Sequence, residues 1–214
     1  TDTGVVGKDL CKLGLRLSPC TEGKRLRKGW NNETATSDFE KLRRFEGDNF
    51  HIWSGRIEGS DLLWGCLDFD VKDGKTGYES YLCIVALNGS PPDDLWNVRT
   101  PSGGFHIEGY QKKYHRWKFV DVDVYTRNDT GHWMAPGSKT PNGTYALTSG
   151  DIESPGYLDD WIVHDDITRV ATTRARMEAG DNFHDNMRTF AQTLAGWELS
   201  REEIEELKQK SALQ

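Results

Sequence analysis

The sequence has few cysteines, and their spacing predicts neither a disulfide framework nor a zinc site. The four stand at positions 11, 20, 66 and 83 and form no Cys-x-x-Cys pair, so we expect reduced thiols as in cytosolic proteins. No apolar run approaches the roughly 20 residues that cross a bilayer. The first ten residues lack the basic and apolar regions of a secretory signal. These absences predict a cytoplasmic protein without a membrane partner.

The chain also lacks the basic excess that is common in proteins that bind nucleic acids. It carries 27 Lys and Arg against 34 Asp and Glu, a net charge of −7. Two local clusters are nevertheless basic: Lys24, Arg25, Arg27 and Lys28, and then Lys112, Lys113, Arg116 and Lys118, interleaved with Tyr110, Tyr114, Trp117 and Phe119. Basic groups neutralise phosphates and aromatic rings stack on bases, so the second cluster suits a single-stranded template. The alternative is a solvated edge strand whose apolar face turns inward.

The patterning of the 214 residues predicts a mixed α/β protein without internal repeats. Residues 37–46 look helical, with Ser37 and Glu40 at capping-box spacing. Residues 78–87 favour a helix, although a strand is the alternative. Predicted strands cover residues 61–71, part of 98–110, the alternating stretch 117–125, residues 132–135 and the surroundings of Tyr145.

The character of the sequence changes beyond Gly150. Phe183, Met187, Phe190 and Leu194 recur at helical spacing and predict a buried stripe. Ser200 and Glu203 then predict the start of a charged helix. We therefore divide the chain into a domain over residues 1–165 and a helical extension over residues 166–214.

Two pairs of aspartates are the main candidates for chemistry. Residues two apart in a strand share a face, so Asp68 and Asp70 should project together, and so should Asp121 and Asp123. Carboxylates that converge repel one another unless a cation lies between them. Mg²⁺ or Mn²⁺ prefers such oxygen ligands, and two ions can stabilise an in-line phosphoryl displacement. The alternative for either pair alone is a solvated turn at a strand end.

A second candidate is the segment Ser102-Gly103-Gly104-Phe105-His106. Paired glycines let backbone amides approach an anion, Ser102 adds a hydroxyl donor, and His106 can donate to a phosphate oxygen. The alternative is a turn followed by a core histidine. The segment after Asp68 is neither a calcium loop nor a phosphate loop, because its third acid, Asp73, stands one position too late for the first and it lacks the glycine-rich spacing of the second.

Taken in order, these segments resemble the bifunctional primase-polymerase domain of the archaeo-eukaryotic primase superfamily. The resemblance spans roughly residues 18–162. It rests on five short segments: Lys28-Gly29-Trp30 with Ala35-Thr36-Ser37-Asp38, then Leu67-Asp68-Phe69-Asp70, then residues 99–107 around Ser102 and His106, then Val122-Asp123-Val124 with Met134-Ala135-Pro136-Gly137-Ser138 and Gly143-Thr144-Tyr145, and finally residues 158–162.

The resemblance implies an RRM-like catalytic sheet with a small α/β module beside it and C-terminal helices. It implies that Asp68, Asp70 and Asp123 bind two Mg²⁺ or Mn²⁺ ions, with Asp121 as the reserve for the third ligand. It also implies that Ser102, Gly103, Gly104 and His106 hold the incoming nucleoside triphosphate. Lys24, Arg56 and Lys139 are candidates for phosphate or template contacts that the sequence does not rank.

The function implied is template-directed nucleotidyl transfer, for primer synthesis, chain extension or both. The expected partners are a single-stranded DNA template, a primer, nucleoside triphosphates and a helicase domain or subunit, as in phage and plasmid replication proteins. One alternative is a non-catalytic nucleotide or DNA-binding module, although every candidate carboxylate is present. The other is a replication-initiator nuclease, which requires a His-hydrophobic-His metal-binding motif that the sequence lacks.

Overall fold

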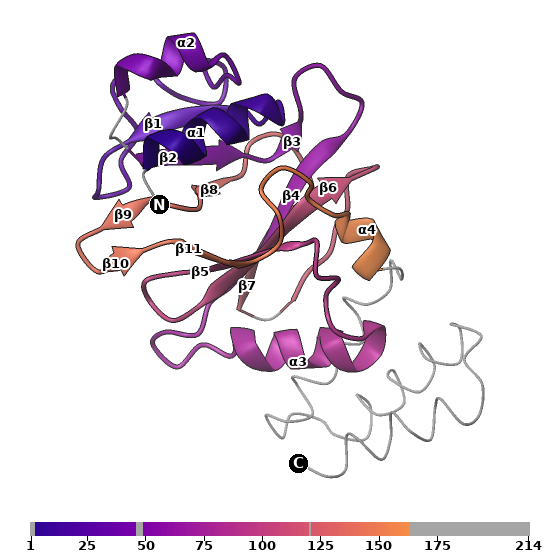
Figure 1. Cartoon of the computed structure of the whole chain (residues 1–214). Helices are drawn as coiled ribbons and strands as arrows, with labels where there is room; N and C mark the ends of the chain where they lie inside the picture. The colour runs from indigo at the N-terminus through magenta and orange to yellow at the C-terminus, as the bar shows by residue number, and fades with distance from the viewer. Residues whose placement is uncertain (1–2, 46–48, 120, 163–214) are drawn as a thin grey trace.

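A computed structural model describes residues 3–45, 49–119 and 121–162 of the chain (Figure 1). The described part is a mixed α/β structure whose sheets are mostly antiparallel. Its helices are α1 (Thr3–Lys12), α2 (Phe39–Leu42), the 3-10 turn η1 (Arg43–Phe45), α3 (Gly77–Asn88) and α4 (Leu158–Trp161). Its strands are β1 (Leu17–Cys20), β2 (Asn49–Trp53), β3 (Gly55–Arg56), β4 (Leu63–Phe69), β5 (Trp96–Arg99), β6 (Phe105–Gln111), β7 (Val122–Tyr125), β8 (His132–Met134), β9 (Lys139–Thr140), β10 (Gly143–Thr144) and β11 (Ala146–Ser149).

Strand β4 is the centre of the main sheet. The strand order is β11-β5-β6-β4-β3, and β7 also pairs with β4. Strand β6 occupies one edge of β4 along its whole length. The other edge is shared, because β3 pairs with Leu63 and Trp64 while β7 pairs with residues 66–69. The second half of β4 therefore lies between β6 and β7, both antiparallel to it.

Alternate residues of β4 face two different cores. Leu67 and Phe69 pack in the core that contains Ile84 of α3, and Trp64 and Cys66 belong to the core that includes β1, β2 and β8. Because side chains alternate along a strand, Asp68 lies on the same face as Trp64 and Cys66, opposite to α3. Burial of the flanking apolar residues holds this register, since a one-residue slip would turn the carboxylate toward α3.

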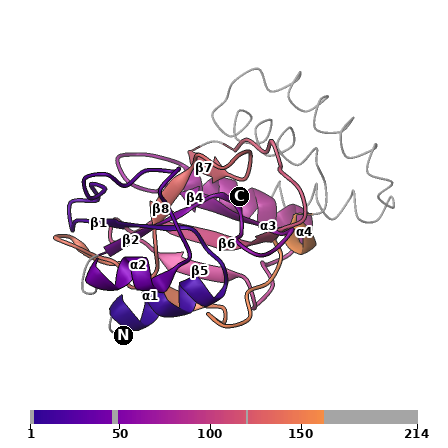
Figure 2. The ribbon, with the colours of Figure 1, turned by 90° about the horizontal axis from the view of Figure 1, so that it is seen from above.

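The N-terminal part of the chain forms a separate layer on that face. Strands β1, β2 and β8 make an antiparallel three-stranded sheet in the order β1-β2-β8. Helices α1 and α2 lie beside this small sheet, whereas α3 lies at the opposite end of the molecule (Figures 1 and 2). Every residue of β2 is buried. The main sheet is thus covered by α3 on one face and by the small sheet on the other.

Several sequence predictions are confirmed by this fold. The strand predicted over residues 61–71 is β4, the apolar segment 78–87 is helix α3 rather than a strand, and the short strand at 132–135 is β8. The predicted strand within 98–110 is the end of β5 and most of β6, with the turn at Ser102-Gly103-Gly104 between them.

Two predictions are wrong in detail. The alternating stretch 117–125 is a strand only from Val122, because the carbonyl oxygen of Trp117 accepts a hydrogen bond from the Arg127 side chain at 2.9 Å instead of pairing in a ladder. The helical stretch predicted over 37–46 begins at Phe39. Its cap is Asp38, which accepts from the amide of Glu40, while Ser37 donates its hydroxyl to Glu58.

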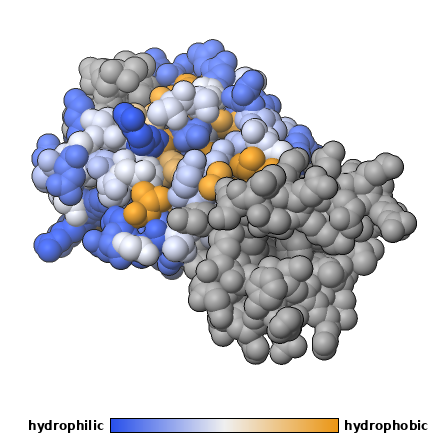
Figure 3. Space-filling model, turned by 90° about the horizontal axis from the view of Figure 1, so that it is seen from below, coloured by the Kyte–Doolittle hydropathy of each residue, from blue (hydrophilic) through white to orange (hydrophobic). Residues whose placement is uncertain are grey.

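The predicted domain over residues 1–165 is described up to residue 162. The helical extension over 166–214, with its stripe of Phe183, Met187, Phe190 and Leu194, lies outside the described residues. Within the described ranges, no helix is both long and apolar enough to span a bilayer. Seen from below, the described surface is mostly hydrophilic with a few hydrophobic residues among them (Figure 3).

Candidate active site

The candidate site is a row of three side chains across neighbouring strands. Asp68 on β4 lies directly opposite His106 on β6 and Asp123 on β7. Cross-strand partners share one face, so the three side chains project toward the small sheet. His106 Nε2 is 3.5 Å from Asp68 Oδ1. Three sequence-predicted residues, separated by up to 55 positions, are therefore brought together by strand register.

Asp70 extends this row beyond the end of β4. Its amide donates to the carbonyl of Asp121 at 3.1 Å, and its carbonyl accepts from the amide of Gly77 at 2.9 Å. A Cβ on Gly77 would lie 2.3 Å from that carbonyl oxygen, so only glycine lets α3 begin so close to Asp70. The Asp70 carboxylate pairs with Lys75. The start of α3 is thereby tied to the second predicted metal ligand.

Asp121 is placed differently from the sequence prediction. We expected it to share a face with Asp123, but β7 begins only at Val122, and Asp121 has a left-handed backbone with φ of 53°. Its carboxylate accepts hydrogen bonds from the amide and hydroxyl of Thr76, at 2.7 and 2.9 Å. Asp121 therefore holds the start of α3, and the expectation of a shared face does not hold. Of the two aspartates, Asp123 is the one opposite Asp68.

The electrostatics of the row favour a bound cation. Burial raises the pKa of Asp68; the His106 and Lys24 charges lower it, and the charges of Asp70 and Asp123 raise it further. Carboxylates that raise one another's pKa are relieved by a cation between them. Their oxygens are the ligands that Mg²⁺ and Mn²⁺ prefer. The chemistry of the donor set therefore fits a divalent ion.

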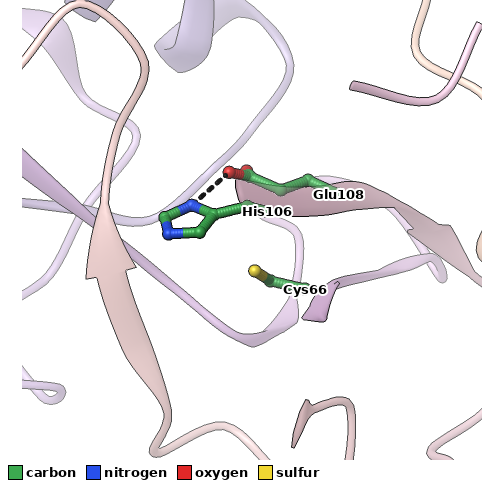
Figure 4. A group of neighbouring side chains, drawn as sticks. All are labelled: Cys66, His106 and Glu108. Atoms are coloured by element: carbon green, nitrogen blue, oxygen red, sulfur yellow. Dashed lines mark hydrogen bonds and ion pairs between the residues drawn. The ribbon is translucent and has the colours of Figure 1, made fainter. Parts of the chain in front are cut away.

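His106 is part of a second, deeper group with Glu108 and Cys66 (Figure 4). Cys66 comes from β4 and lies opposite Glu108 of β6. His106 Nδ1 is 3.2 Å from Glu108 Oε1, and all three residues are buried. Burial lowers the pKa of His106, but the hydrogen bond to Glu108 and the charge of Asp68 outweigh it and raise that pKa overall.

Sequence reasoning did not identify Glu108 or Cys66 as part of a site. One potential ligand atom from each of Cys66, His106 and Glu108 lies within 4.8 Å of the others, which can hold a metal ion. Sulfur and imidazole suit Zn²⁺ better than Mg²⁺ or Mn²⁺. Burial raises the pKa of the Cys66 thiol well above its usual value, with the Glu108 charge adding to the effect. The group therefore does not supply the predicted Mg²⁺ or Mn²⁺ site.

The turn with Ser102, Gly103 and Gly104 joins β5 to β6 beside the end of β4. Thr100 donates its amide to Gly104 at 2.8 Å, and Gly103 has a φ of 92°, which favours glycine. A Cβ on Gly104 would lie 2.5 Å from the carbonyl oxygen of Phe69. Both glycines are thus required by the turn itself. Ser102 is exposed at its tip, with its hydroxyl 3.1 Å from that of Thr100.

Lys24 reaches the site from the N-terminal layer. Its ammonium lies 5.3 Å from the centre of the Tyr145 ring, and the Tyr145 ring is 5.6 Å from that of His106. Lys24 has a left-handed backbone with φ of 63°, in a turn where its amide donates to Thr21. Among the three basic candidates that the sequence did not rank, Lys24 is the one whose charge acts on both Asp68 and His106.

The basic and aromatic segment after β6 is partly anchored and partly exposed. His115 is buried, stacks on Trp117 with ring centres 4.0 Å apart and bonds Asp159 of α4. The exposed residues before, between and after these anchors are Lys112, Lys113, Tyr114, Arg116 and Lys118. The alternative of an edge strand with its apolar face turned inward holds only in part, because Trp117 and Phe119 are buried but Tyr114 is exposed and residues 112–118 form no strand.

Comparison with known proteins adds nothing to this geometry: no family model matches the chain, and no curated protein matches it.

Proposed function

We propose that the chain is a DNA primase-polymerase, a nucleotidyltransferase that joins nucleotides on a single-stranded template. The observation that carries the proposal is the row of Asp68, Asp123 and His106 across three adjacent antiparallel strands, with Asp70 at its end. Two facing carboxylates fit a divalent cation, and a buried imidazole beside them fits a phosphate oxygen. This is the residue set that the primase-polymerase resemblance implies.

The strand order supports the same proposal. In chain order, β4, α3, β5, β6 and β7 build a four-stranded antiparallel unit with the spatial order β5-β6-β4-β7. That is the order of an RRM-like sheet whose first helix is α3. The second helix of such a fold would precede β7, where this chain has the basic segment with buried Trp117 instead. The β1-β2-β8 layer is our candidate for the accompanying small module.

The proposed reaction is attack of a primer 3′-hydroxyl on the α-phosphate of a nucleoside triphosphate. A phosphodiester bond forms, the bond to the β-phosphate breaks, and pyrophosphate leaves. Asp68, Asp70 and Asp123 would hold two Mg²⁺ or Mn²⁺ ions, which when bound lower the pKa of the hydroxyl and neutralise the triphosphate. His106 and Ser102 would donate hydrogen bonds to phosphate oxygens. The chain itself supplies placement and charge.

The remaining partners are assigned by charge. Lys24 would contact the triphosphate, because its ammonium lies over the ring of Tyr145, which neighbours His106. Lys112, Tyr114 and Arg116 would contact the single-stranded template through phosphates and stacking. A helicase domain or subunit stays an expectation from the resemblance.

The test is nucleotide incorporation on single-stranded DNA with labelled nucleotides, with and without a primer, in Mg²⁺ or Mn²⁺. The control variants are Asp68→Ala/Asp70→Ala and, matched in charge, Asp61→Ala/Asp93→Ala, which changes two exposed carboxylates outside the row. We expect products that the first variant loses and the second keeps. De novo products indicate a primase, and primer extension alone indicates a polymerase. No incorporation by a folded protein that binds metal and triphosphate would refute the proposal and favour a binding module.

A further inference from the structure

We propose that Glu108 is a positioning residue, which holds the His106 ring with its Nε2 atom toward Asp68 and the nucleotide. The inference rests on the proposed function for its catalytic meaning. Its structural content is independent of that function, because it concerns which ring nitrogen of His106 carries the bond to Glu108. Nothing in the sequence pattern indicated a role for Glu108.

The geometry leaves Glu108 with one partner. Its Oε1 atom is 3.2 Å from His106 Nδ1, and its Oε2 atom is buried without a hydrogen-bond partner. Its cross-strand neighbours are Cys66 on β4 and Trp96 on β5, neither of which is a cation. Within the described residues, His106 is therefore the group toward which this carboxylate is directed.

The burial of Glu108 makes a purely structural role costly. The side chain is 0% exposed, and a buried carboxylate is strongly destabilising unless it is paired and hydrogen-bonded. An apolar residue of similar size would suit a site between Cys66 and Trp96 better if packing alone mattered. The presence of a glutamate at this position is explained if its hydrogen bond is needed to hold the His106 imidazole.

That bond determines what His106 presents to the site. A carboxylate accepts, so Nδ1 carries a proton and donates it to Glu108. The other nitrogen, Nε2, is then the one that lies 3.5 Å from Asp68 Oδ1. Without Glu108 the ring loses its hydrogen bond at Nδ1 and can change tautomer, because the neighbours that remain are Asp68 on the Nε2 side and the Tyr145 ring at 5.6 Å between centres. The same arrangement orients metal-binding and catalytic histidines generally.

The experiment compares Glu108→Gln, which keeps an acceptor oxygen, with Glu108→Leu, which removes it at similar volume. Gln111→Leu is the matched control, since Gln111 is also a buried polar residue of β6 without a side-chain hydrogen bond among the described residues, and it lies on the other face from His106. Each full-length variant is assayed for kcat and for KM of the nucleotide. The His106 ring nitrogens are followed by ¹⁵N NMR, with His106→Ala to assign them.

We expect Glu108→Leu to raise the nucleotide KM about tenfold or more, the effect of a lost charged hydrogen bond. Glu108→Gln should stay within about threefold, and Gln111→Leu should leave KM unchanged. The NMR spectra should show a protonated Nδ1 in the wild type. Of the variants, only Glu108→Leu should lose the signal of the protonated Nδ1. An unprotonated Nδ1 in the wild type, or identical ring spectra in Glu108→Leu, would overturn the inference. If the wild type incorporates no nucleotide, the proposed function fails while the ring spectra still decide the role of Glu108.

Discussion

Asp121 and Asp123 are two residues apart, yet the structure separates their roles completely. Asp121 accepts two hydrogen bonds from Thr76 at the start of α3, whereas Asp123 is exposed on β7 opposite Asp68. We therefore predict that Asp121→Ala lowers stability and that Asp123→Ala lowers activity. This pair of variants therefore tests which of the two aspartates is the third metal ligand.

The magnitudes follow from the contacts. Losing a side-chain acceptor at a helix start costs about 0.5–2 kcal/mol. Alanine tolerates a φ of 53° less well than aspartate, which adds about 1 kcal/mol. The total of about 1.5–3 kcal/mol lowers Tm by roughly 3–12 °C in a domain of this size. Asp123→Ala should change the free energy of unfolding by no more than about 0.5 kcal/mol, as for an ordinary exposed residue.

The assay measures thermal unfolding, Mn²⁺ binding by calorimetry and primer extension on each variant. Asp121→Asn is the matched control, because asparagine tolerates the left-handed backbone and keeps an acceptor oxygen for Thr76. We expect Asp123→Ala to keep its Tm and to lose Mn²⁺ affinity and extension. An Asp123→Ala variant with normal Mn²⁺ binding, or an Asp121→Ala variant that is fully stable and inactive, would refute the assignment.

Three further predictions concern the surroundings of the site. Burial and the His132 charge lower the pKa of His51 to about 4 from 6.5, so the unfolded chain takes up the proton first and stability falls as pH drops below 6.5. Urea unfolding at about pH 7.5 and about pH 5 should show a loss of stability that is about 2 kcal/mol larger in the wild type than in His51→Phe. Equal losses would exclude His51 as the cause. Lys24→Ala should raise the nucleotide KM about tenfold with unchanged Tm, as for a lost charged hydrogen bond. The control Lys24→Arg should keep the KM low. An unaltered KM in Lys24→Ala would contradict the proposed contact. Gly77→Ala should lower the free energy of unfolding by about 2 kcal/mol or more through its clash with Asp70, and a normal Tm would show that α3 can shift.

The parts of the fold that could be predicted from sequence have strong local signals. Strand β4 is an apolar run that ends in acids, and α3 is long and apolar between a glycine and a Gly-Ser-Pro-Pro loop, so each segment specifies its own structure. The alternation of 117–125 is as strong, but the first half of that stretch is held by Arg127 and by stacking of Trp117 on His115. Tertiary contacts overrode the local preference there.

The candidate site was predictable only in part for a related reason. Asp68 and His106 could be proposed from the chain, but their opposition depends on register between strands that are distant in sequence. Glu108 was missed because a glutamate in a strand is usually exposed, and only the structure shows it buried next to His106. Lys24 could not be ranked because its reach depends on a turn whose left-handed residue is not glycine.

The pairing of β4 with both β6 and β7 also sets when the site can exist during folding. The contact between Asp68 and His106 closes a loop of 38 residues, and the contact with Asp123 closes one of 55. Non-local pairings form late and slowly, because their loop-closure entropy is lost before the strands stabilise one another. A growing chain that has made β4 but not β7 therefore carries Asp68 and Asp70 without Asp123, with an open sheet edge beside them. Pairing of β7 both closes that edge and assembles the row, so the site and the closed edge of β4 arise in the same step.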